Sequence, residues 1–246
     1  MSKIIYRPAG PASEYSKWAA NFYNGCHNMC TYCYCNNGFL AKTLGGTNVR
    51  LKKSLIDETT AYDIFCKELD KYKVEIIKDG GLHFNFVSDP CLPSTIKLNW
   101  KCIDYALEQG VPVQVLTKRA GWIYTMPVEN ALENHPELLK IGFTLTGCDD
   151  LEQGASPNLA RIGAMRILHD AGIFTWASCE PIIDPKRTYK MIQKSLDCCD
   201  HYKIGILSGK KSYSPQDIRD FVTAVKALNP KDVAWKNSLL EFVQKP

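Results

Sequence analysis

The feature that most restricts the fold is a regular alternation between short apolar runs and longer amphipathic stretches. The apolar runs at 82–87, 112–116, 140–145, 173–177 and 202–207 have the length of strands. Apolar residues at helical spacing predict helices around 62–69 and over 94–110, 127–139 (interrupted near Pro136), 156–172, 184–196 and 214–228. With a short first strand at 21–25, the chain contains about six β–α units.

This alternation predicts a parallel sheet whose strands are joined by right-handed crossovers. Six units are too few for a closed eight-stranded barrel, so we expect an α/β fold that forms an open partial (β/α)6 barrel in a single domain. A flat, doubly wound sheet is the alternative. Residues 1–20 are rich in proline and aromatic side chains, and we expect them to form an irregular N-terminal arm beside a barrel domain at 21–246.

A cluster of three cysteines follows the first predicted strand, in the stretch Cys26-His-Asn-Met-Cys30-Thr-Tyr-Cys33. Thiolates in such a short array select iron–sulfur clusters or zinc. Three ligands leave one coordination position open, which is typical of a reactive site, whereas structural metal sites are usually closed. Cys35 could close the site as a fourth ligand, but side chains at that short spacing diverge, so we expect it to be a spare.

Polar residues follow nearly every predicted strand. In parallel α/β folds, sites form at the carboxyl ends of the strands. We therefore expect the site to be built from the loops after the strands, whose residues include Cys26, Cys30 and Cys33; Ser88, Asp89 and Cys91; Thr117, Lys118 and Arg119; Thr144 and Thr146; Cys179 and Glu180; and Lys210 and Lys211.

The cysteine spacing, with an aromatic residue before the last cysteine, resembles the signature of the radical S-adenosylmethionine (AdoMet) superfamily. The resemblance implies the same partial barrel and a 4Fe–4S cluster on Cys26, Cys30 and Cys33. It also implies that the amino and carboxylate groups of AdoMet chelate the fourth iron. The reduced cluster then cleaves AdoMet to a 5′-deoxyadenosyl radical, which abstracts a hydrogen atom from a substrate.

Shorter motifs over residues 21–207 resemble the spore photoproduct lyase-like branch of that superfamily: Tyr23-x-Gly25-Cys26, Ser88-Asp89, Thr117-Lys118 and Glu180-Pro181-Ile182-Ile183. The resemblance implies one role for each position. Ser88 and Asp89 would hold the methionyl amino group, Lys118 the methionyl carboxylate, Thr144 and Thr146 the ribose hydroxyls, and Glu180 the nucleoside. Without that resemblance, Asp89 reads as a turn or cap residue, Lys118 as a solvated lysine, the two threonines as ordinary strand residues and Glu180 as a surface ion-pair partner.

Three further residues carry expectations about the radical step. The resemblance implies that Tyr32 shields the cluster and that Tyr34 takes part in a radical relay. Phe86 stands where spore photoproduct lyase has its hydrogen-donating cysteine, so we do not expect that repair reaction itself. Cys91, two residues beyond Asp89, is a candidate for a thiol in the same cavity.

Composition limits the class of protein. The 246 residues include 45% hydrophobic and 23% charged residues, which is ordinary for a globular domain. We find no apolar run long enough to span a membrane and no secretory signal, and eleven scattered cysteines indicate reduced thiols in a cytoplasmic protein. The net charge of +4 is too small to indicate nucleic-acid binding by itself.

The sequence leaves three classes of function open. The leading hypothesis is a radical AdoMet enzyme that acts on a nucleobase, nucleotide or nucleic acid and receives electrons from a reductant such as flavodoxin or ferredoxin. The second is a radical modifier of a peptide or small metabolite. The third is a non-catalytic metal or iron–sulfur protein in which Cys26, Cys30, Cys33 and Cys35 all bind the metal.

Overall fold

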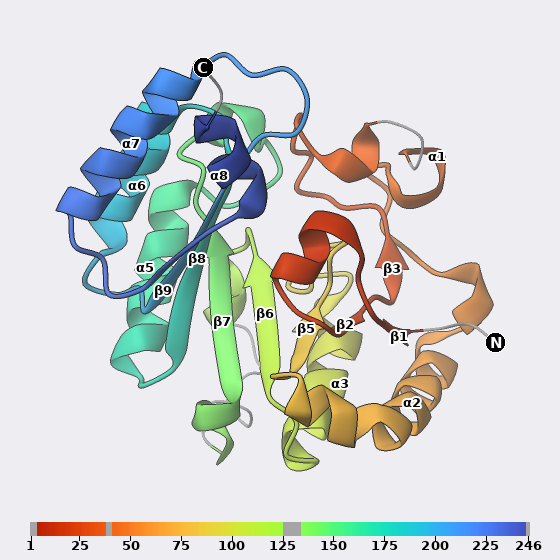
Figure 1. The fold of residues 1–246 in the computed structure, drawn as a ribbon. Coiled ribbons are helices and arrows are strands. Elements are labelled where there is room, and N and C mark those ends of the chain that lie inside the picture. The colour runs from red at the N-terminus through yellow and green to blue at the C-terminus, as the bar shows by residue number, and fades with distance from the viewer. Residues whose placement is uncertain (1–3, 38–40, 125–133, 245–246) are drawn as a thin grey trace. The chain divides into compact units, whose positions relative to one another are not determined.

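The computed structural model describes residues 4–37, 41–124 and 134–244. The chain divides into two compact units (Figure 1). Residues 1–140 and 151–155 form the first unit, and residues 141–150 and 156–246 form the second. No described helix is both long and apolar enough to cross a lipid bilayer.

Four short strands of the first unit lie in the order β1-β2-β5-β6. They are β1 (Ile5–Tyr6), β2 (Ala19–Ala20), β5 (Leu82–Phe84) and β6 (Val113–Thr117). β1 pairs antiparallel with β2, whereas β2, β5 and β6 are parallel. A separate antiparallel pair, β3 (Tyr23–Asn24) and β4 (Arg50–Leu51), leads into and out of the cysteine region.

Within 4–37, 41–124 and 134–140, the α-helices described for the first unit are α1 (Ala41–Leu44), α2 (Glu58–Lys78) and α3 (Ile96–Glu108). α2 and α3 pack against each other, and α3 also contacts β6 (Figure 1). Asp57 caps α2 by accepting a hydrogen bond from the backbone N–H of Thr60. α2 buries Ala61, Phe65, Leu69 and Ile76, so its apolar stripe faces the core as the spacing predicts.

The second unit contains β7 (Leu139–Thr144, its last four residues), β8 (Phe174–Ile182), β9 (His201–Ile206) and β10 (Val233–Trp235), in that order. β9 pairs parallel with both β8 and β10. α5 (Asn158–Asp170) and α6 (Pro185–Ser195) contact β8, α7 (Pro215–Ala227) packs on α6, and α8 (Asn237–Val243) contacts β9 (Figure 1).

Local sequence signals explain where two of these helices begin. Asp184 accepts hydrogen bonds from the backbone N–H groups of Lys186 and Arg187 at the start of α6. Ser214 and Asp217 form a reciprocal capping box at the start of α7. In both helices proline occupies the first turn, where its missing N–H has no intrahelical partner to lose.

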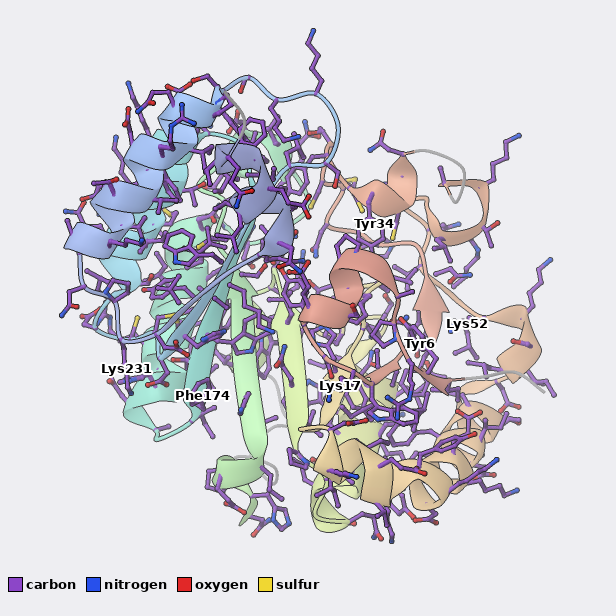
Figure 2. All side chains as sticks on the ribbon, viewed as in Figure 1. Tyr6, Lys17, Tyr34, Lys52, Phe174 and Lys231 are labelled. Carbon is purple, nitrogen blue, oxygen red and sulfur yellow. The ribbon has the colours of Figure 1, made fainter. Side chains whose placement is uncertain are left out.

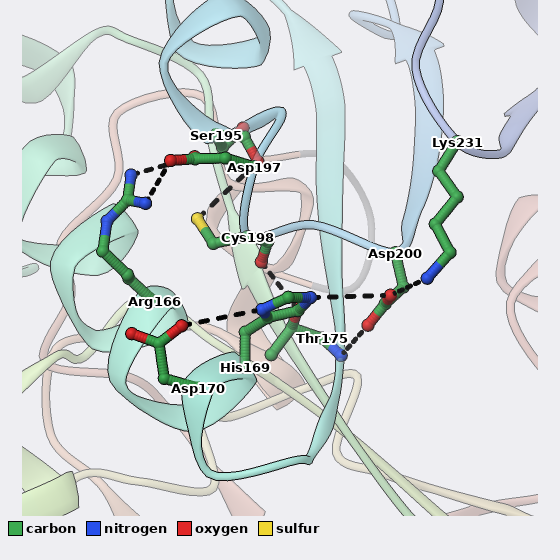
Figure 3. A network of polar contacts seen from close by, with 9 residues as sticks. All are labelled: Arg166, His169, Asp170, Thr175, Ser195, Asp197, Cys198, Asp200 and Lys231. Carbon is green, nitrogen blue, oxygen red and sulfur yellow. Dashed lines mark hydrogen bonds and ion pairs between the residues drawn. The ribbon is translucent and has the colours of Figure 1, made fainter.

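A polar network holds the amino end of β8 (Figure 3). The Asp200 carboxylate accepts a hydrogen bond from the backbone N–H of Thr175, and it forms ion pairs with Lys231 at 2.5 Å and with His169 at 3.8 Å. Arg166 pairs with Asp197 beside it. This network lies at the end of β8 away from Glu180, which indicates a structural role for it.

The structure corrects parts of the sequence-based prediction. Residues 1–20 are not an irregular arm throughout, because β1 and β2 join the sheet. The predicted first strand at 21–25 is only β3, and it pairs outside the main sheet. Most of the helix predicted at 127–139 lies outside the described residues. The division of the chain into an arm at 1–20 and one barrel domain at 21–246 stays a prediction.

Candidate active site

The cysteine loop, which we define as residues 25–37, follows β3 in the first unit. A five-residue segment, 151–155, lies along it and is called the strap here. Cys30 forms an isolated antiparallel bridge with Glu152 of the strap. The backbone N–H of Thr31 donates to Leu151 O, and the N–H of Gly154 donates to Asn28 O at 3.1 Å. The strap therefore fixes the backbone between the first and second cysteines.

Side chains reinforce the contact between the loop and the strap. The Tyr32 hydroxyl donates to the Glu152 carboxylate, which is buried. The Arg119 guanidinium donates to the Gly154 carbonyl and so ties the strap to the segment after β6. Gly154 allows this packing because any Cβ at that position would overlap the carbonyl oxygen of His27. The strap brings Glu152 and Gly154 to a loop more than a hundred residues away in sequence.

The turn after β5 meets the same loop through Asp89. Its carboxylate accepts hydrogen bonds from Asn28 Nδ2 at 2.7 Å and from the backbone N–H of Lys118 at 2.8 Å. It also accepts from Thr117 Oγ1 at 2.7 Å and from the backbone N–H of Cys91 at 2.9 Å. The structure therefore brings Asp89 and Lys118 to the cysteine loop, as expected for residues at strand ends.

Lys118 and the three cysteine thiols share one electrostatic environment. Burial, followed by the Asp89 charge, raises the pKa of Cys26 to about 12, and burial also raises the pKa of Cys30. The Lys118 ammonium, in contrast, lowers the pKa of Cys26, Cys30 and Cys33. A cation that stabilises all three thiolates is what a metal site built from thiols requires, because the ligands must lose their protons to bind.

Cys35 lies against the last cysteine of the motif. A hydrogen bond from its thiol is the main cause that lowers the pKa of Cys33 to about 6, so Cys33 is the most readily ionised thiol of the loop. Cys35 itself is buried, and the hydrogen bond with Cys33 raises its pKa. The expectation that Cys35 is a spare stays a prediction, and the two thiols influence each other's pKa.

Two candidate residues for the radical step occupy different surroundings. Tyr34, labelled in Figure 2, is 58% exposed, and its hydroxyl donates to the carbonyl oxygen of Phe86. Cys91 is buried, and burial raises the pKa of its thiol, which interacts with Thr117 and Trp100. The Cys91 thiol is therefore enclosed by packed neighbours.

The remaining predicted residues belong to the second unit. Thr144 and Thr146 are buried, and the Thr146 hydroxyl accepts a hydrogen bond from the backbone N–H of Cys148. The Glu180 carboxylate forms an ion pair with Lys236 at 2.7 Å. Gly205 makes room for this pair, since a Cβ there would meet Glu180 and Lys236 atoms at 2.9–3.0 Å.

The donor set fits an iron–sulfur cluster. Its three ligand candidates are thiols on one loop, which is the usual chemistry of such clusters. No three His, Cys, Asp or Glu side chains in 4–37, 41–124 and 134–244 are grouped as around one metal ion. Three thiolates on a cubane bind three different iron atoms, so they need not converge on one point. Beside the loop, Ser88 Oγ and Asn28 Oδ1 are buried hydrogen-bonding atoms that lack a partner among the described residues.

Sequence reasoning missed Asn28, Glu152, Gly154 and Lys236. Asn28 lies between two predicted ligands, and only the Asp89 contact shows its importance. Glu152 and Gly154 lie in a stretch that gave no strand or helix signal. Lys236 follows β10, and its side chain is only 3% exposed, which is unusual for lysine and marks it once the fold is known.

Comparison with known proteins supports the fold. No family model matches the sequence. The chain is 24% identical over 212 residues to the uncharacterized protein ORF301 of the Acidianus two-tailed virus, a match that covers 80% of this chain and 66% of the viral protein. The chain therefore spans just under two thirds of the length of that relative.

Solved structures resemble the chain over most of its length. Spore photoproduct lyase complexed with dinucleoside spore photoproduct matches with a TM-score of 0.65 and 13% identity, over 94% of this chain and 80% of that one. A mutant of the same lyase with bound AdoMet and dinucleoside spore photoproduct matches with a TM-score of 0.60 and 15% identity, over 88% and 62%. SuiB of Streptococcus suis bound to AdoMet matches with a TM-score of 0.58 and 12% identity, over 87% and 50%.

These likenesses confirm the predicted fold class. Two of these structures hold AdoMet, and the chain shares with them a mixed α/β fold with mostly parallel strands, that of a partial barrel. At 12–15% identity the likeness concerns the fold, and the assignment of chemistry depends on the cysteine loop and its surroundings.

Proposed function

We propose that this protein is a radical AdoMet enzyme in which Cys26, Cys30 and Cys33 hold a 4Fe–4S cluster. The observation that carries the proposal is a loop with three thiols, fixed by the strap and by Asp89, in a fold shared with AdoMet-bound structures. When bound, the cluster and AdoMet supply a 5′-deoxyadenosyl radical that abstracts hydrogen from a substrate.

Residues of the first unit prepare the site for this chemistry. Lys118 lowers the pKa of the three thiols, and its ammonium is the group we assign to the methionyl carboxylate of AdoMet. Tyr32, hydrogen-bonded to Glu152, shields the cysteine loop, with its ring 5.7 Å from the Lys118 ammonium nitrogen. Tyr34 is the exposed aromatic residue that we assign to a radical relay.

The residues of the second unit keep their predicted roles as proposals. Thr144 and Thr146 would contact the ribose, and Glu180 the nucleoside. The pairing of Glu180 with Lys236 gives its carboxylate a fixed position, which is a requirement for recognising a hydroxyl or amine.

We propose a nucleobase, nucleotide or nucleic acid as the substrate. The support is the likeness to a lyase structure that holds a dinucleoside. Phe86 in place of a hydrogen-donating cysteine argues for a reaction other than that lyase's repair step, and Cys91 is the thiol proposed for hydrogen donation. Binding to single-stranded DNA that weakens as salt rises supports a nucleic-acid substrate, and no binding at low salt contradicts a nucleic-acid substrate and leaves the nucleobase or nucleotide.

The test is anaerobic. Protein loaded with iron and sulfide is given AdoMet and dithionite, and 5′-deoxyadenosine is measured, with Cys30→Ala as the control. We expect product from the wild type and none from the variant. Flavodoxin or ferredoxin then replaces dithionite to identify the type of electron donor. A wild type that holds a reducible cluster and forms no 5′-deoxyadenosine contradicts the proposal.

A second candidate function follows from Cys35. Its thiol interacts with Cys33, so it lies close enough to the motif to supply a fourth ligand and close the site. The protein would then be a non-catalytic metal or iron–sulfur protein. Iron content separates the two: Cys35→Ala keeps the cluster if three ligands suffice, and it loses the cluster if the site is closed. Modification of a peptide or small metabolite is tested with the same enzyme once 5′-deoxyadenosine forms.

A further inference from the structure

The side chain of Asp89 is the point where three segments of the first unit meet. Its four hydrogen bonds come from Asn28 in the cysteine loop, from Thr117 and Lys118 at the end of β6, and from Cys91 in its own turn. All four donor–acceptor distances lie between 2.7 and 2.9 Å, which is the range of strong hydrogen bonds.

The backbone of Asp89 extends the same junction. Its carbonyl oxygen accepts a hydrogen bond from Thr95 Oγ1, the residue before α3, at 2.7 Å. One residue therefore connects the cysteine loop, the strand end that carries Lys118 and the start of a helix.

An ordinary turn residue does not account for these contacts. An aspartate that caps its own turn needs only the bond to the N–H two residues later, here Cys91. The other three donors lie 61, 28 and 29 residues away in sequence. A carboxylate that is 7% exposed and satisfied by four neutral donors has used the acceptor positions of its two oxygen atoms.

We infer that Asp89 is a positioning residue, which fixes the cysteine loop against the strand end carrying Lys118, and that it does not bind the methionyl amino group of AdoMet. The part that concerns AdoMet rests on the proposed function. The part that concerns the loop does not, because the hydrogen bonds exist without any ligand. Asp89→Asn tests both parts, since its amide NH₂ would take the place of one acceptor oxygen and so face two of the four donors.

The first measurement uses metal-free protein. Cys30 is 8% exposed, so iodoacetamide reaches it only when the loop opens. We expect Asp89→Asn to raise the rate at which iodoacetamide labels Cys30 roughly tenfold. Peptide mass spectrometry measures this rate. Asn28→Ala removes one donor and is expected to give a similar rise. The double variant is expected to give no larger rise than Asp89→Asn alone, because both changes break the same contact. If Asp89→Asn does not fold, Thr117→Val, which removes a single donor, is expected to give a smaller rise.

A matched control is Asp79→Asn. Asp79 also accepts a side-chain hydrogen bond, from Trp18 Nε1 at 3.0 Å, and it pairs with Lys17, but it lies at the end of α2 and contacts no part of the cysteine loop. Cys30 labelling in this variant is expected to equal that of the wild type. Labelling that rises as much in the control would mean general loosening and would overturn the inference.

The second measurement uses protein loaded with iron and sulfide. A positioning role predicts that Asp89→Asn and Asn28→Ala both lower iron per chain, and that each variant binds AdoMet with wild-type affinity per intact cluster. Unchanged Cys30 labelling together with weakened AdoMet binding in Asp89→Asn alone would assign Asp89 to the amino group and overturn the inference. If the wild type itself takes up no cluster, the proposed function fails, while the labelling result still decides the role of Asp89 in the loop.

Discussion

Gly154 of the strap and His27 of the cysteine loop pack so closely that a single added methyl group would overlap backbone. The ideal Cβ of residue 154 overlaps the carbonyl oxygen of His27 and lies 3.1 Å from the carbonyl carbon of Asn28. The neighbouring N–H of Gly154 donates to Asn28 O. The absence of a side chain at position 154 is therefore a condition for placing the strap along the cysteines.

The first prediction concerns this contact. Gly154→Ala is expected to destabilise the fold by about 2 kcal/mol or more, because the overlap is with backbone that cannot rotate away. Iron uptake should fall with it, since the strap holds Cys30. Urea unfolding and iron content are the measurements. Gly163→Ala is the matched control. That glycine lies inside α5 with no atom within 4 Å of an added Cβ, so alanine should stabilise by roughly 0.5–1 kcal/mol. Equal effects at the two positions would contradict the argument.

The second prediction concerns Lys118. Lys118→Met is expected to weaken AdoMet binding by about 10- to 100-fold, which is the range for losing a hydrogen bond to a charged group. Iron content should fall less than in Cys30→Ala, because the three thiols remain although the cation that favours their thiolates is lost, so affinity is compared per intact cluster. Equilibrium binding of AdoMet to the iron-loaded protein is the measurement. Lys118→Arg keeps the charge and should recover part of the affinity. Full affinity in Lys118→Met would remove Lys118 from the carboxylate site.

The third prediction concerns the ion pair between Glu180 and Lys236. Lys236→Met leaves the Glu180 carboxylate, whose side chain is 19% exposed, without its cation. The expected loss of stability is about 3 kcal/mol, because an uncompensated buried charge costs more than the pair contributes. Glu180→Gln combined with Lys236→Met should recover most of that loss. Urea unfolding of the two single variants and the double variant gives the coupling free energy of the pair. If the losses of unfolding free energy in the single variants add up to the loss in the double variant, the pair is not energetically coupled.

The fourth prediction concerns pH. Burial, and then the charge of Glu108, raises the pKa of Asp104 from 3.8 to about 6. The folded state therefore binds this proton more tightly than the unfolded chain does. The contribution of Asp104 to the free energy of unfolding favours the folded state below about pH 4, and it is lost as the pH rises through 6.

Asp104→Asn should thus stabilise the protein at pH 7 and have little effect at pH 4. A pKa difference of about two between the folded and unfolded states corresponds to about 3 kcal/mol. Solvent screening of this half-buried group reduces the expected gain in the free energy of unfolding to roughly 1 kcal/mol. Urea unfolding at both pH values is the measurement. Glu108→Gln removes the neighbouring charge and should give a smaller gain with the same pH dependence. An equal gain at pH 4 and pH 7 would show that the charge of Asp104 is not the cause.

Much of the secondary structure could be predicted because its signals are local. The apolar spacing in α2, the capping Asp184 and the Ser214–Asp217 box each specify an element within a few residues. The secondary-structure predictions failed where pairing with a distant strand decided whether a segment became a strand. Residues 19–20 became a strand of the main sheet because their partner is β5, more than sixty residues away.

The amino-acid sequence by itself determined the alternation of strands and helices over much of residues 58–228, the three-thiol loop and the polar residues at the strand ends, since spacing along the chain encodes all of these. Only the tertiary structure decided what holds the loop. The contacts of Asp89 with Asn28, of Glu152 with Tyr32 and of Glu180 with Lys236 join residues 61, 120 and 56 positions apart. Hydrogen bonds of such long range leave no periodic trace in a sequence, because their partners become neighbours only when the strands pair and the loops close.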